Sequence, residues 1–421
     1  MQILYVTAVA YPIPDANAKI ALRLAAEMRR LGHQVELLAQ ADELPPTSSI
    51  QREGITVHLT IPAWCRLDAV FKMNQGKNFK KYRHLLACVQ HPAWALAFAS
   101  RKNPRADRLV HRRELIHHMR ELAAKKDWDA VIVQCQPYLA WELAPYAFRG
   151  LPLYLHQLDP FADNPYYLPY PRATTLCRER RALDAARHIF TTPLLIAAGE
   201  QGELAGYLSK ATAVEFPCLV EPSGEFFSSP FPADGALRLV YTGVLNDEYR
   251  SPAWLLALCE QLWQMEPRFQ LHIFGANQSK CLHDALRQPP AWLFYHGQVP
   301  PEQARAATLA ADALVNLGNT YPNMMPSKIL DYLATGRPIV NICKLENCPT
   351  LRLTGRYPLA LNLVDGSDIK NTAVRLLSFL HTNAGKRLSF SQVESLFPQA
   401  TPSFVAEQML CALESDKERK R

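Results

Sequence analysis

The sequence lacks the short motifs that mark several common chemistries. The first apolar run is not followed by G-x-G-x-x-G, and neither G-x-x-x-x-G-K-[ST] nor G-x-S-x-G occurs along the chain. An ordinary dinucleotide site, a P-loop phosphate site and an α/β-hydrolase nucleophile each depend on one of these patterns. The sequence therefore argues against an NAD-dependent enzyme of the usual kind, a P-loop ATPase and an α/β-hydrolase.

The ten cysteines contain no C-x-x-C pair, and the two closest are Cys343 and Cys348. This spacing is typical of neither a zinc site nor a disulfide framework, so we expect scattered thiols in a reducing cytoplasm. The thirteen histidines add no metal-ligand spacing. We therefore predict that the protein needs no metal and no tightly bound cofactor.

Long hydrophobic runs are also missing. A spanning helix needs about 18 consecutive apolar residues, and the best candidate, residues 130–148, is broken by Gln, Glu and Pro. The first seven residues have no basic segment and no cleavage site, so they resemble a buried strand more than a signal peptide. These features predict a cytoplasmic protein without a spanning helix.

The composition is that of a packed protein. The 421 residues are 48% hydrophobic and 20% charged, and a chain of this length usually forms two or three domains. The 32 prolines outnumber the 17 glycines, so many helices should end at proline-rich loops.

Apolar runs and amphipathic stretches alternate along the chain. A strand over residues 2–8, a helix over 18–31 and a strand over 35–39 require a parallel sheet with a crossover helix. The same pattern predicts further strands at 57–61, 130–133, 153–157, 188–192, 237–242, 269–274, 292–296, 313–317 and 338–342. It predicts further helices at 137–147, 179–186, 194–207, 252–265, 301–311, 327–335 and 404–421, and helical structure with interruptions over 71–126.

The alternation is interrupted over residues 214–236, where Pro, Ser and Gly cluster, and we predict a linker there. The expected fold class is α/β, with two Rossmann-like, doubly wound domains at residues 1–213 and 237–400 and a last helix over 401–421. Such domains bind ligands beyond the carboxyl ends of their strands.

The most informative segment covers residues 319–340. A loop should end at Pro326 and a helix should begin near Ser327, where amide groups of the first turn can hold an anion such as diphosphate. Lys328 opposes the helix dipole in that turn, but it suits a phosphate ligand. Asp331, one turn on, can accept hydrogen bonds from ribose hydroxyl groups. Taken alone, both charged residues could instead be solvated surface side chains.

This segment resembles the donor-site motif of retaining GT-B glycosyltransferases of the family-4-like group, P-S-K-[IL]-x-[ED]-Y-x-A-x-G-[KR]-P. The matching positions are Pro326, Ser327, Lys328, Asp331, Tyr332, Ala334, Gly336, Arg337 and Pro338. The resemblance implies that Asp331 binds the ribose. It also implies that the preceding loop, with Asn323, Met324 and Met325, offers amide groups to the sugar and the diphosphate. Asn323 stands where the family carries the first of two glutamates.

Other segments extend the resemblance over most of the chain, strongly after residue 237 and weakly from 60 to 150. Leu239-Val-Tyr-Thr-Gly-Val-Leu245, followed by Arg250, resembles the family's strand, glycine loop and basic residue at the diphosphate. The strands that end at Gly275 and before Gln298 resemble those that border the nucleobase. The resemblance thus adds Gly243, Arg250, Gly275 and Gln298 to the expected donor site.

The resemblance implies two domains that face a cleft and a C-terminal helix that crosses back to the first domain. It also implies transfer with retention from a nucleotide sugar, UDP-linked in preference to GDP-linked, to a saccharide or lipid-linked acceptor. Synthesis of surface polysaccharide or glycoconjugate is the expected setting. Without a metal, Lys328 and Arg250 would meet the diphosphate charge. An epimerase or phosphorylase of the same fold and a non-catalytic GT-B scaffold subunit remain alternatives.

Four residues of the first domain are candidates for the acceptor side. His156 ends a strand and Asp159 follows three residues later. We expect His156 to bond the transferred sugar or the acceptor and to act in catalysis with Lys328 and Arg250. Asp15 and Asn17 lie where the family usually carries Gly-Gly, and could contact the acceptor or the diphosphate. A buried core histidine and ordinary turn residues are the alternatives.

Aromatic side chains offer a further hypothesis for sugar stacking. The candidates are Trp141, Tyr166, Tyr167 and Tyr170. Rings in a proline-rich loop more often serve packing alone.

The net charge of +7 is concentrated in residues 66–126, which hold about fifteen basic and four acidic residues interleaved with Trp, Phe and Tyr. In one interpretation, this block forms solvated helix faces. In the other, it docks the protein peripherally on anionic lipid at the inner face of a membrane. No RNA-binding module is present in the sequence, so nucleic acid is not an expected partner.

Overall fold

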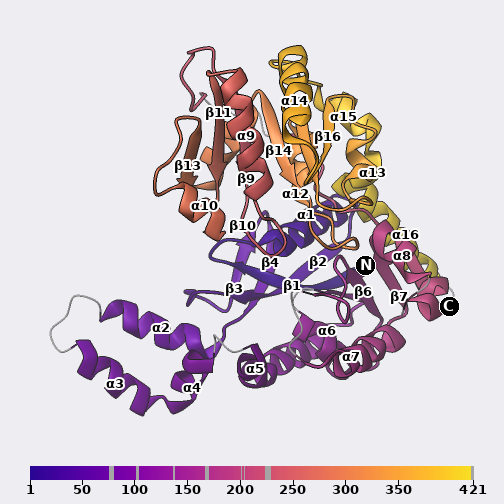
Figure 1. Cartoon of the computed structure of the whole chain (residues 1–421). Helices are drawn as coiled ribbons and strands as arrows, with labels where there is room; N and C mark the ends of the chain where they lie inside the picture. The colour runs from indigo at the N-terminus through magenta and orange to yellow at the C-terminus, as the bar shows by residue number, and fades with distance from the viewer. Residues whose placement is uncertain are drawn as a thin grey trace. The chain divides into compact units, whose positions relative to one another are not determined.

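The computed structural model describes residues 1–74, 80–100, 104–135, 138–165, 170–200, 202, 204–222 and 229–418, with the side chains of residues 100 and 104–110 left aside. The chain divides into two compact units (Figure 1). Unit 1 comprises residues 1–217 together with 402–421, and unit 2 comprises residues 218–401.

Unit 1 is built on a sheet in the order β3-β4-β2-β1-β5-β6-β7-β8. Only β3 runs antiparallel, against β4; the other neighbours in this sheet are parallel. The strands are β1 (Gln2–Tyr11), β2 (Gln34–Ala41), β3 (Ser49–Arg52), β4 (Ile55–Thr60), β5 (Ala130–Gln134), β6 (Leu153–Gln157), β7 (His188–Thr191) and β8 (Ala211–Ala213). Strands β5 and β6 are fully buried, as expected for strands covered on both faces.

The helices of unit 1 connect these strands. They are α1 (Ala16–Arg30), α2 (Ala63–Met73), α3 (Lys80–Gln90), α4 (Pro92–Ser100), α5 (Pro104–Lys125), α6 (Tyr138–Ala147), α7 (Arg172–Ala185), α8 (Pro193–Gly199), a 3-10 helix (Ala205–Lys210) and α16 (Pro402–Glu418). In Figure 1, α2, α3 and α4 form a small helical group beside the sheet, as the contacts among these helices also indicate.

The last helix, α16, belongs to unit 1 although it follows unit 2 in the sequence. It packs against α1. Its end is tied to the sheet, because Asp416 accepts a hydrogen bond of 2.7 Å from the Tyr154 hydroxyl group and Lys417 Nζ donates one of 2.7 Å to Asp129. The expected return of the C-terminal helix to the first unit is therefore confirmed.

Unit 2 contains a six-stranded, wholly parallel sheet in the order β13-β11-β9-β14-β15-β16. Its strands are β9 (Leu237–Thr242), β11 (Phe269–Phe274), β13 (Leu293–Gly297), β14 (Ala313–Leu317), β15 (Ile339–Cys343) and β16 (Ala360–Val364). Two short strands, β10 (Leu245–Asn246) and β12 (Asn277–Gln278), pair with each other just beyond β9 and β11.

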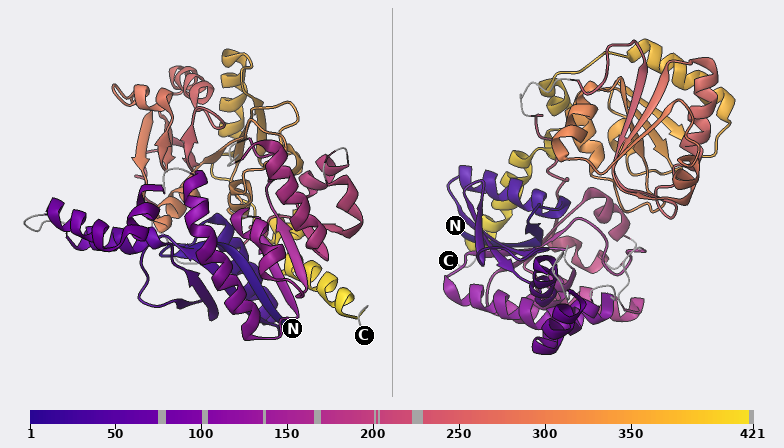
Figure 2. Two further views of the ribbon diagram at one scale, coloured as in Figure 1. Left: turned by 90° about the horizontal axis from the view of Figure 1, so that it is seen from below. Right: turned by 90° about the vertical axis from the view of Figure 1, so that its left-hand side faces the viewer.

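Helices lie on both sides of this sheet (Figure 2, right). They are α9 (Ala253–Met265), α10 (Lys280–Ala285), α11 (Pro301–Ala310), α12 (Lys328–Ala334), α13 (Leu351–Thr354), α14 (Ile369–Asn383), α15 (Phe390–Leu396) and a 3-10 helix (Pro398–Ala400). One apolar core joins the sheet to α9 and α14 through residues such as Leu271, Leu258 and Leu376. Successive residues of a strand point to opposite faces of the sheet, so His272 and Phe274 of β11 lie on the face opposite this core.

The two sheets confirm the predicted fold class, α/β with two Rossmann-like units. The expected helix over 194–207 is wrong in part, because α8 ends at Gly199 and a 3-10 helix begins at Ala205. Gly199 ends α8 and Gly202 lies in the interruption, where Gly202 N donates to Gly199 O in a turn. Glycine has a low helix propensity, which favours this break. Neither β16 nor α14 was predicted from the sequence.

Candidate functional site

The sheet of unit 2 has one point at which the strand order reverses. The chain connects from β13 across to β14, so the order reverses between β9 and β14. Open parallel sheets bind ligands beyond the carboxyl ends of the strands at such a point. The expected donor residues Gly243, Gly275 and Gln298 follow β9, β11 and β13 directly.

Two of these residues, Gly243 and Gly275, are in close contact. Gly243 N donates a hydrogen bond of 2.8 Å to the carbonyl oxygen of Phe274. A Cβ atom added to Gly275, where φ is +136°, would lie 2.1 Å from the carbonyl oxygen of Gly243. Only glycine fits this position. The pairing of β10 with β12 continues the contact, so the loops after β9 and β11 form one connected edge.

Arg250 lies at this edge and is directed toward the end of β14. Its Nε donates a hydrogen bond of 2.9 Å to Oδ1 of Asn319, and the Asn319 amide donates one of 2.9 Å to the carbonyl oxygen of Met324. The neighbouring Asp247 does not hold Arg250; it accepts a hydrogen bond from Ser279 instead. Among the described residues, no carboxylate forms an ion pair with Arg250, so its charge is available to a ligand.

Lys328 approaches the same place from α12. Its Nζ donates a hydrogen bond of 3.2 Å to Oγ1 of Thr242, the last residue of β9. The Thr242 amide donates a hydrogen bond of 2.8 Å to the buried hydroxyl group of Tyr332, which fixes α12 against the end of β9. Burial raises the pKa of Tyr332 to about 12, so the hydroxyl group stays neutral. Two cations thus flank the end of the strand at which the order reverses.

The rest of the predicted donor motif lies around α12. Met325 and Pro326 are buried, Asn323, Met324 and Ser327 are half-buried, and Lys328 and Asp331 are exposed. The amide groups of Ile329 and Leu330 donate to the carbonyl oxygens of Pro326 and Ser327. The helix therefore offers fewer first-turn amides to an anion than the sequence pattern alone predicts. Asp331 was expected one turn on, but because α12 begins at Lys328 it lies in the first turn.

Two further motif residues have structural roles. Gly336 has a φ of +71°, and a Cβ atom there would lie 2.0 Å from the carbonyl oxygen of Leu388. The Arg337 guanidinium group donates a hydrogen bond of 2.5 Å to the carbonyl oxygen of Leu309. These positions of the motif therefore stabilise the fold near α12.

Lys344, which the sequence analysis missed, supports the Arg250 loop. It follows β15 directly, its Nζ donates a hydrogen bond of 2.8 Å to the carbonyl oxygen of Ser251, and it forms an ion pair with Asp365 after β16. Its side chain is only 10% exposed. The signal in the sequence was a lysine immediately after a buried apolar strand, because a lysine in such surroundings usually has a charged or polar partner.

In unit 1, the predicted acceptor residues Asp15 and Asn17 lie at the start of α1. Asp15 is the N-cap: its carboxylate accepts hydrogen bonds from the amides of Ala18 (2.8 Å) and Val9 (3.3 Å). Burial raises the pKa of Asp15, and these bonds partly oppose that rise. The structure thus gives Asp15 a capping role. Its contact with an acceptor stays a prediction, as does that of the half-buried Asn17.

His156 is completely buried at the end of β6. Its Nδ1 lies 2.5 Å from the Tyr5 hydroxyl oxygen, and its Nε2 has no hydrogen-bond partner among the described residues. Burial lowers the pKa of His156 to about 3, so the ring is neutral. Asp159 follows β6 and is half-buried. The roles of both residues toward a sugar stay predictions.

The aromatic candidates lie in different surroundings. Trp141 is buried and donates a hydrogen bond of 2.9 Å to the carbonyl oxygen of Val133. The Arg178 guanidinium group lies 4.0 Å from the ring centre of Tyr170. Tyr166 and Tyr167 lie outside the described residues.

Within the described part of the chain, no three His, Cys, Asp or Glu side chains gather as metal ligands would. Over the same residues, none of the helices combines the length and the apolar character that crossing a membrane requires.

The fold is similar to that of several solved structures. No family profile and no curated protein sequence matches the chain. It is similar over 99% of both chains to sucrose-phosphate synthase from Thermosynechococcus elongatus, with a TM-score of 0.63 and 13% identity. It is similar over 98% of both chains to the catalytic domain of starch synthase IV from Arabidopsis thaliana bound to ADP and acarbose (TM-score 0.59, 10% identity).

A third similar structure is Anabaena Alr3699/HepE in complex with UDP, with a TM-score of 0.57, 13% identity and coverage of 99% of this chain and 100% of that one. These neighbours are GT-B glycosyltransferases, each with two Rossmann-like domains. The chain has a GT-B fold. At such low identity the likeness establishes the fold alone, so the chemistry must be argued from the residues of the site.

Proposed function

We propose that this protein is a retaining glycosyltransferase that takes a sugar from a nucleotide sugar, UDP-linked in preference to GDP-linked. The acceptor in this proposal is a saccharide or a lipid-linked saccharide, in the synthesis of surface polysaccharide or glycoconjugate. The observation that supports it best is the pair of cations, Arg250 and Lys328, at the end of β9 where the strand order of unit 2 reverses.

This pair suits a diphosphate. Arginine presents a fork that can bond two phosphate oxygens, and lysine adds a point charge. When the bond from the sugar to the diphosphate breaks, negative charge develops on the leaving oxygens, and fixed cations stabilise that charge without reorganisation. We propose that Arg250 and Lys328 supply this stabilisation without a metal ion, and that Lys344 positions Arg250 through the carbonyl group of Ser251.

We propose the remaining donor contacts from residues that lie beyond the ends of the neighbouring strands. The connected loops at Gly243 and Gly275, with Gln298 beyond β13, would border the base and the diphosphate. The exposed Asp331 would bind the ribose, and residues 323–327 would approach the sugar. On the acceptor side, we propose that His156, Asp159, Asp15 and Asn17 contact the acceptor or the transferred sugar.

Calorimetric titration with UDP, GDP and ADP tests the donor site. We expect UDP to bind most tightly, and Arg250→Ala and Lys328→Ala each to weaken it by about 10- to 100-fold, the equivalent of one charge-assisted hydrogen bond. Arg268→Ala and Lys370→Ala are matched controls, because both residues are exposed elsewhere in unit 2. If none of the three nucleotides bound, or if the controls lost as much affinity as the site variants, the donor site would be wrong.

The stereochemistry needs its own measurement. Incubation with a panel of UDP-sugars and acceptor extracts should release UDP, and NMR of the product should show that the anomeric configuration of the donor is kept. Asp331→Ala should slow UDP release at low donor concentration more than at saturation, because ribose binding is expected to contribute to both the ground state and the transition state. An inverted product would contradict the retaining mechanism.

A lipid-linked acceptor would require contact with a membrane, and α3 offers a surface for it. Four apolar side chains of this helix share one face at i, i+3, i+4 and i+7 and are 41–70% exposed: Tyr82, Leu85, Leu86 and Val89. Residues 80–100 contain no acid, and Lys80, Lys81 and Arg83 are exposed beside the apolar face. Such a combination favours an anionic bilayer, to which each basic residue adds roughly 1 kcal/mol.

Sedimentation with phosphatidylglycerol vesicles tests this contact. The double variant Leu85→Ser/Val89→Ser should bind these vesicles roughly 10-fold more weakly, whereas Val374→Ser, at an exposed apolar position of α14, should bind like the parent protein. Vesicles of phosphatidylcholine alone should bind weakly. Equal binding to both lipids, or no effect of the double variant, would remove the membrane from the proposal.

A further inference from the structure

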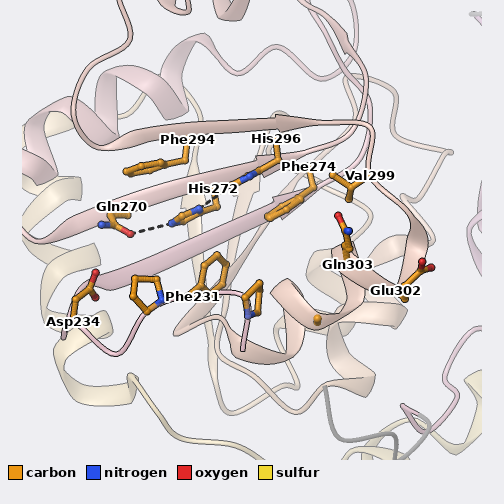
Figure 3. Close-up of a pocket in the computed structure, with 13 residues that line it drawn as sticks. Phe231, Asp234, Gln270, His272, Phe274, Phe294, His296, Val299, Glu302 and Gln303 are labelled. Carbon is orange, nitrogen blue, oxygen red and sulfur yellow. Dashed lines mark hydrogen bonds between the residues drawn. The ribbon is translucent and has the colours of Figure 1, made fainter. Parts of the chain in front are cut away.

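A cavity lies within unit 2, and neither Arg250 nor Lys328 is among the residues that line it. It has a volume of about 750 Å³ and is bordered by β11, β13, α11 and residues 230–234, on the face of the sheet opposite the core with α9 and α14 (Figure 3). Cavities of this size hold small organic ligands. The donor-site residues predicted from the sequence do not line it.

The walls of the cavity are aromatic. The Phe294 ring is stacked on His272 with 4.8 Å between ring centres, and the Phe231 ring lies 4.6 Å from His272 on another side (Figure 3). Phe274 is stacked on His296 at 4.1 Å. Phe294 is 37% exposed, so part of this aromatic surface is open to a ligand. Aromatic faces of this kind pack against the C–H groups of a sugar ring.

Hydrogen bonds between the two histidines fix which atom remains for a ligand. Gln270 Oε1 can only accept, so His272 Nε2, at 3.1 Å, must donate to it. His272 Nδ1 then carries a lone pair and accepts a hydrogen bond of 3.0 Å from His296 Nε2. This chain leaves Nδ1 of His296 as a hydrogen-bond acceptor, on a residue that is itself exposed.

The charges of the cavity exclude an anionic ligand. Burial lowers the pKa of His272 to about 3 and desolvation lowers that of His296, so both rings are neutral at pH 7. Asp234 forms an ion pair with Arg238, a buried side chain whose guanidinium group lies over the Phe231 ring, 5.3 Å from its centre. The other charged residue among those that line the cavity is Glu302, in the first turn of α11, where the helix dipole stabilises it.

We propose that this cavity is a saccharide-binding site of unit 2, separate from the donor site and suited to an uncharged sugar. The aromatic walls pack against the sugar ring, and His296 Nδ1, Gln303 and Glu302 accept hydrogen bonds from its hydroxyl groups. A phosphate group finds no free cation among the lining residues. The site would keep a saccharide bound while transfer takes place elsewhere, and only this role rests on the proposed function.

Saturation-transfer NMR and titration with maltotriose and triacetylchitotriose test the site. We expect at least one of them to bind in the millimolar range or below. Phe294→Ala should weaken that binding at least fivefold, and His296→Phe, which keeps the ring but removes the acceptor, should weaken it at least threefold. Phe404→Ala is the matched control, since Phe404 is 38% exposed but lies in α16 of unit 1.

The outcomes separate this proposal from the proposed function. Binding that Phe294→Ala does not change, binding that Phe404→Ala reduces equally, or no binding of either sugar would overturn the saccharide site. If UDP displaced the sugar and Phe294→Ala weakened UDP as well, the cavity would hold the nucleobase, and the proposal would also be wrong. Failure of the parent protein to bind UDP would refute the donor site and leave the saccharide result standing.

Discussion

The two units share one order of parallel strands but differ in the side chains at the ends of their central strands. In unit 2, Arg250 and Lys328 flank the end of β9. In unit 1, β1 and β6 carry a buried neutral pair, Tyr5 and His156, and the charged groups that contact the end of β1 include the capping carboxylate of Asp15 and the Arg52 guanidinium group, which donates to the carbonyl oxygen of Pro12. The fold therefore determines where a ligand can bind, and the side chains decide which ligand it is.

The difference also concerns how the loops are held. In unit 2 the loops after β9 and β11 meet at two half-buried glycines and continue into paired strands. In unit 1 the loop after β6 is held by the buried carboxylate of Glu179, which accepts hydrogen bonds of 3.1 Å from Ala162 N and from Gln157 Nε2. A close contact between two glycines thus joins the loops of unit 2, whereas a buried acid holds the loop of unit 1.

The largest expected effect comes from Gly275→Ala. The new Cβ atom would collide with the Gly243 carbonyl oxygen and require a φ that alanine rarely adopts, so we expect a loss of about 4 kcal/mol in the free energy of unfolding of unit 2 and no measurable UDP binding. Gly297→Ala is the control, because Gly297 also has a positive φ but has nothing within 4 Å of the added atom. Denaturant unfolding and UDP titration should separate the two variants. Similar losses in both would show that the contact between the loops is unimportant.

Next in size is the pH dependence caused by Glu179. Burial raises its pKa from 4.5 to about 7, so the folded protein binds a proton that the unfolded chain has released between these values. The stability from this group is full below pH 4.5 and falls as the pH rises through 7, by about 3 kcal/mol. Glu179→Gln should flatten this part of the stability profile, and the exposed Glu407→Gln should not. A Glu179→Gln profile as steep as that of the parent protein would contradict the assignment.

The smallest effect compares two buried tyrosine hydroxyl groups. Tyr332→Phe leaves the Thr242 amide without its partner, and Tyr5→Phe does the same to Nδ1 of His156. Each should lower the free energy of unfolding by about 1–2 kcal/mol. Only Tyr332→Phe should weaken UDP binding, by roughly 3- to 10-fold, because only its partner lies beside Lys328. An equal loss of UDP affinity in Tyr5→Phe would contradict the expectation that only unit 2 binds the nucleotide.

The sequence was sufficient for the strands whose apolar runs are buried, such as β9 and β14, because a short continuous apolar run is typical of a parallel strand covered on both faces. It did not reveal β16, an edge strand in which Leu363 is the one fully buried residue. Its pattern resembles that of a loop as much as that of a strand. Edge strands are hard to recognise for this reason.

Only part of the candidate site could be predicted from the sequence. The motif at residues 326–338 drew attention to Lys328 and Asp331, and a basic residue after β9 drew attention to Arg250. The partners of these side chains could not be predicted, because the bond from Arg250 to Asn319 joins residues 69 positions apart and depends on how β9 and β14 align. Lys344 was missed for the same reason, since its role depends on Ser251 and Asp365.

The position of α16 has a consequence for synthesis of the chain. Unit 2 lies between two parts of unit 1 in the sequence, so all of residues 218–401 are translated before the helix that completes unit 1. Until then Tyr154 and Asp129 lack the partners that Asp416 and Lys417 provide. Unit 2 can therefore finish folding before unit 1, and the surface of α1 that α16 contacts stays uncovered until α16 has left the ribosome and packed against it.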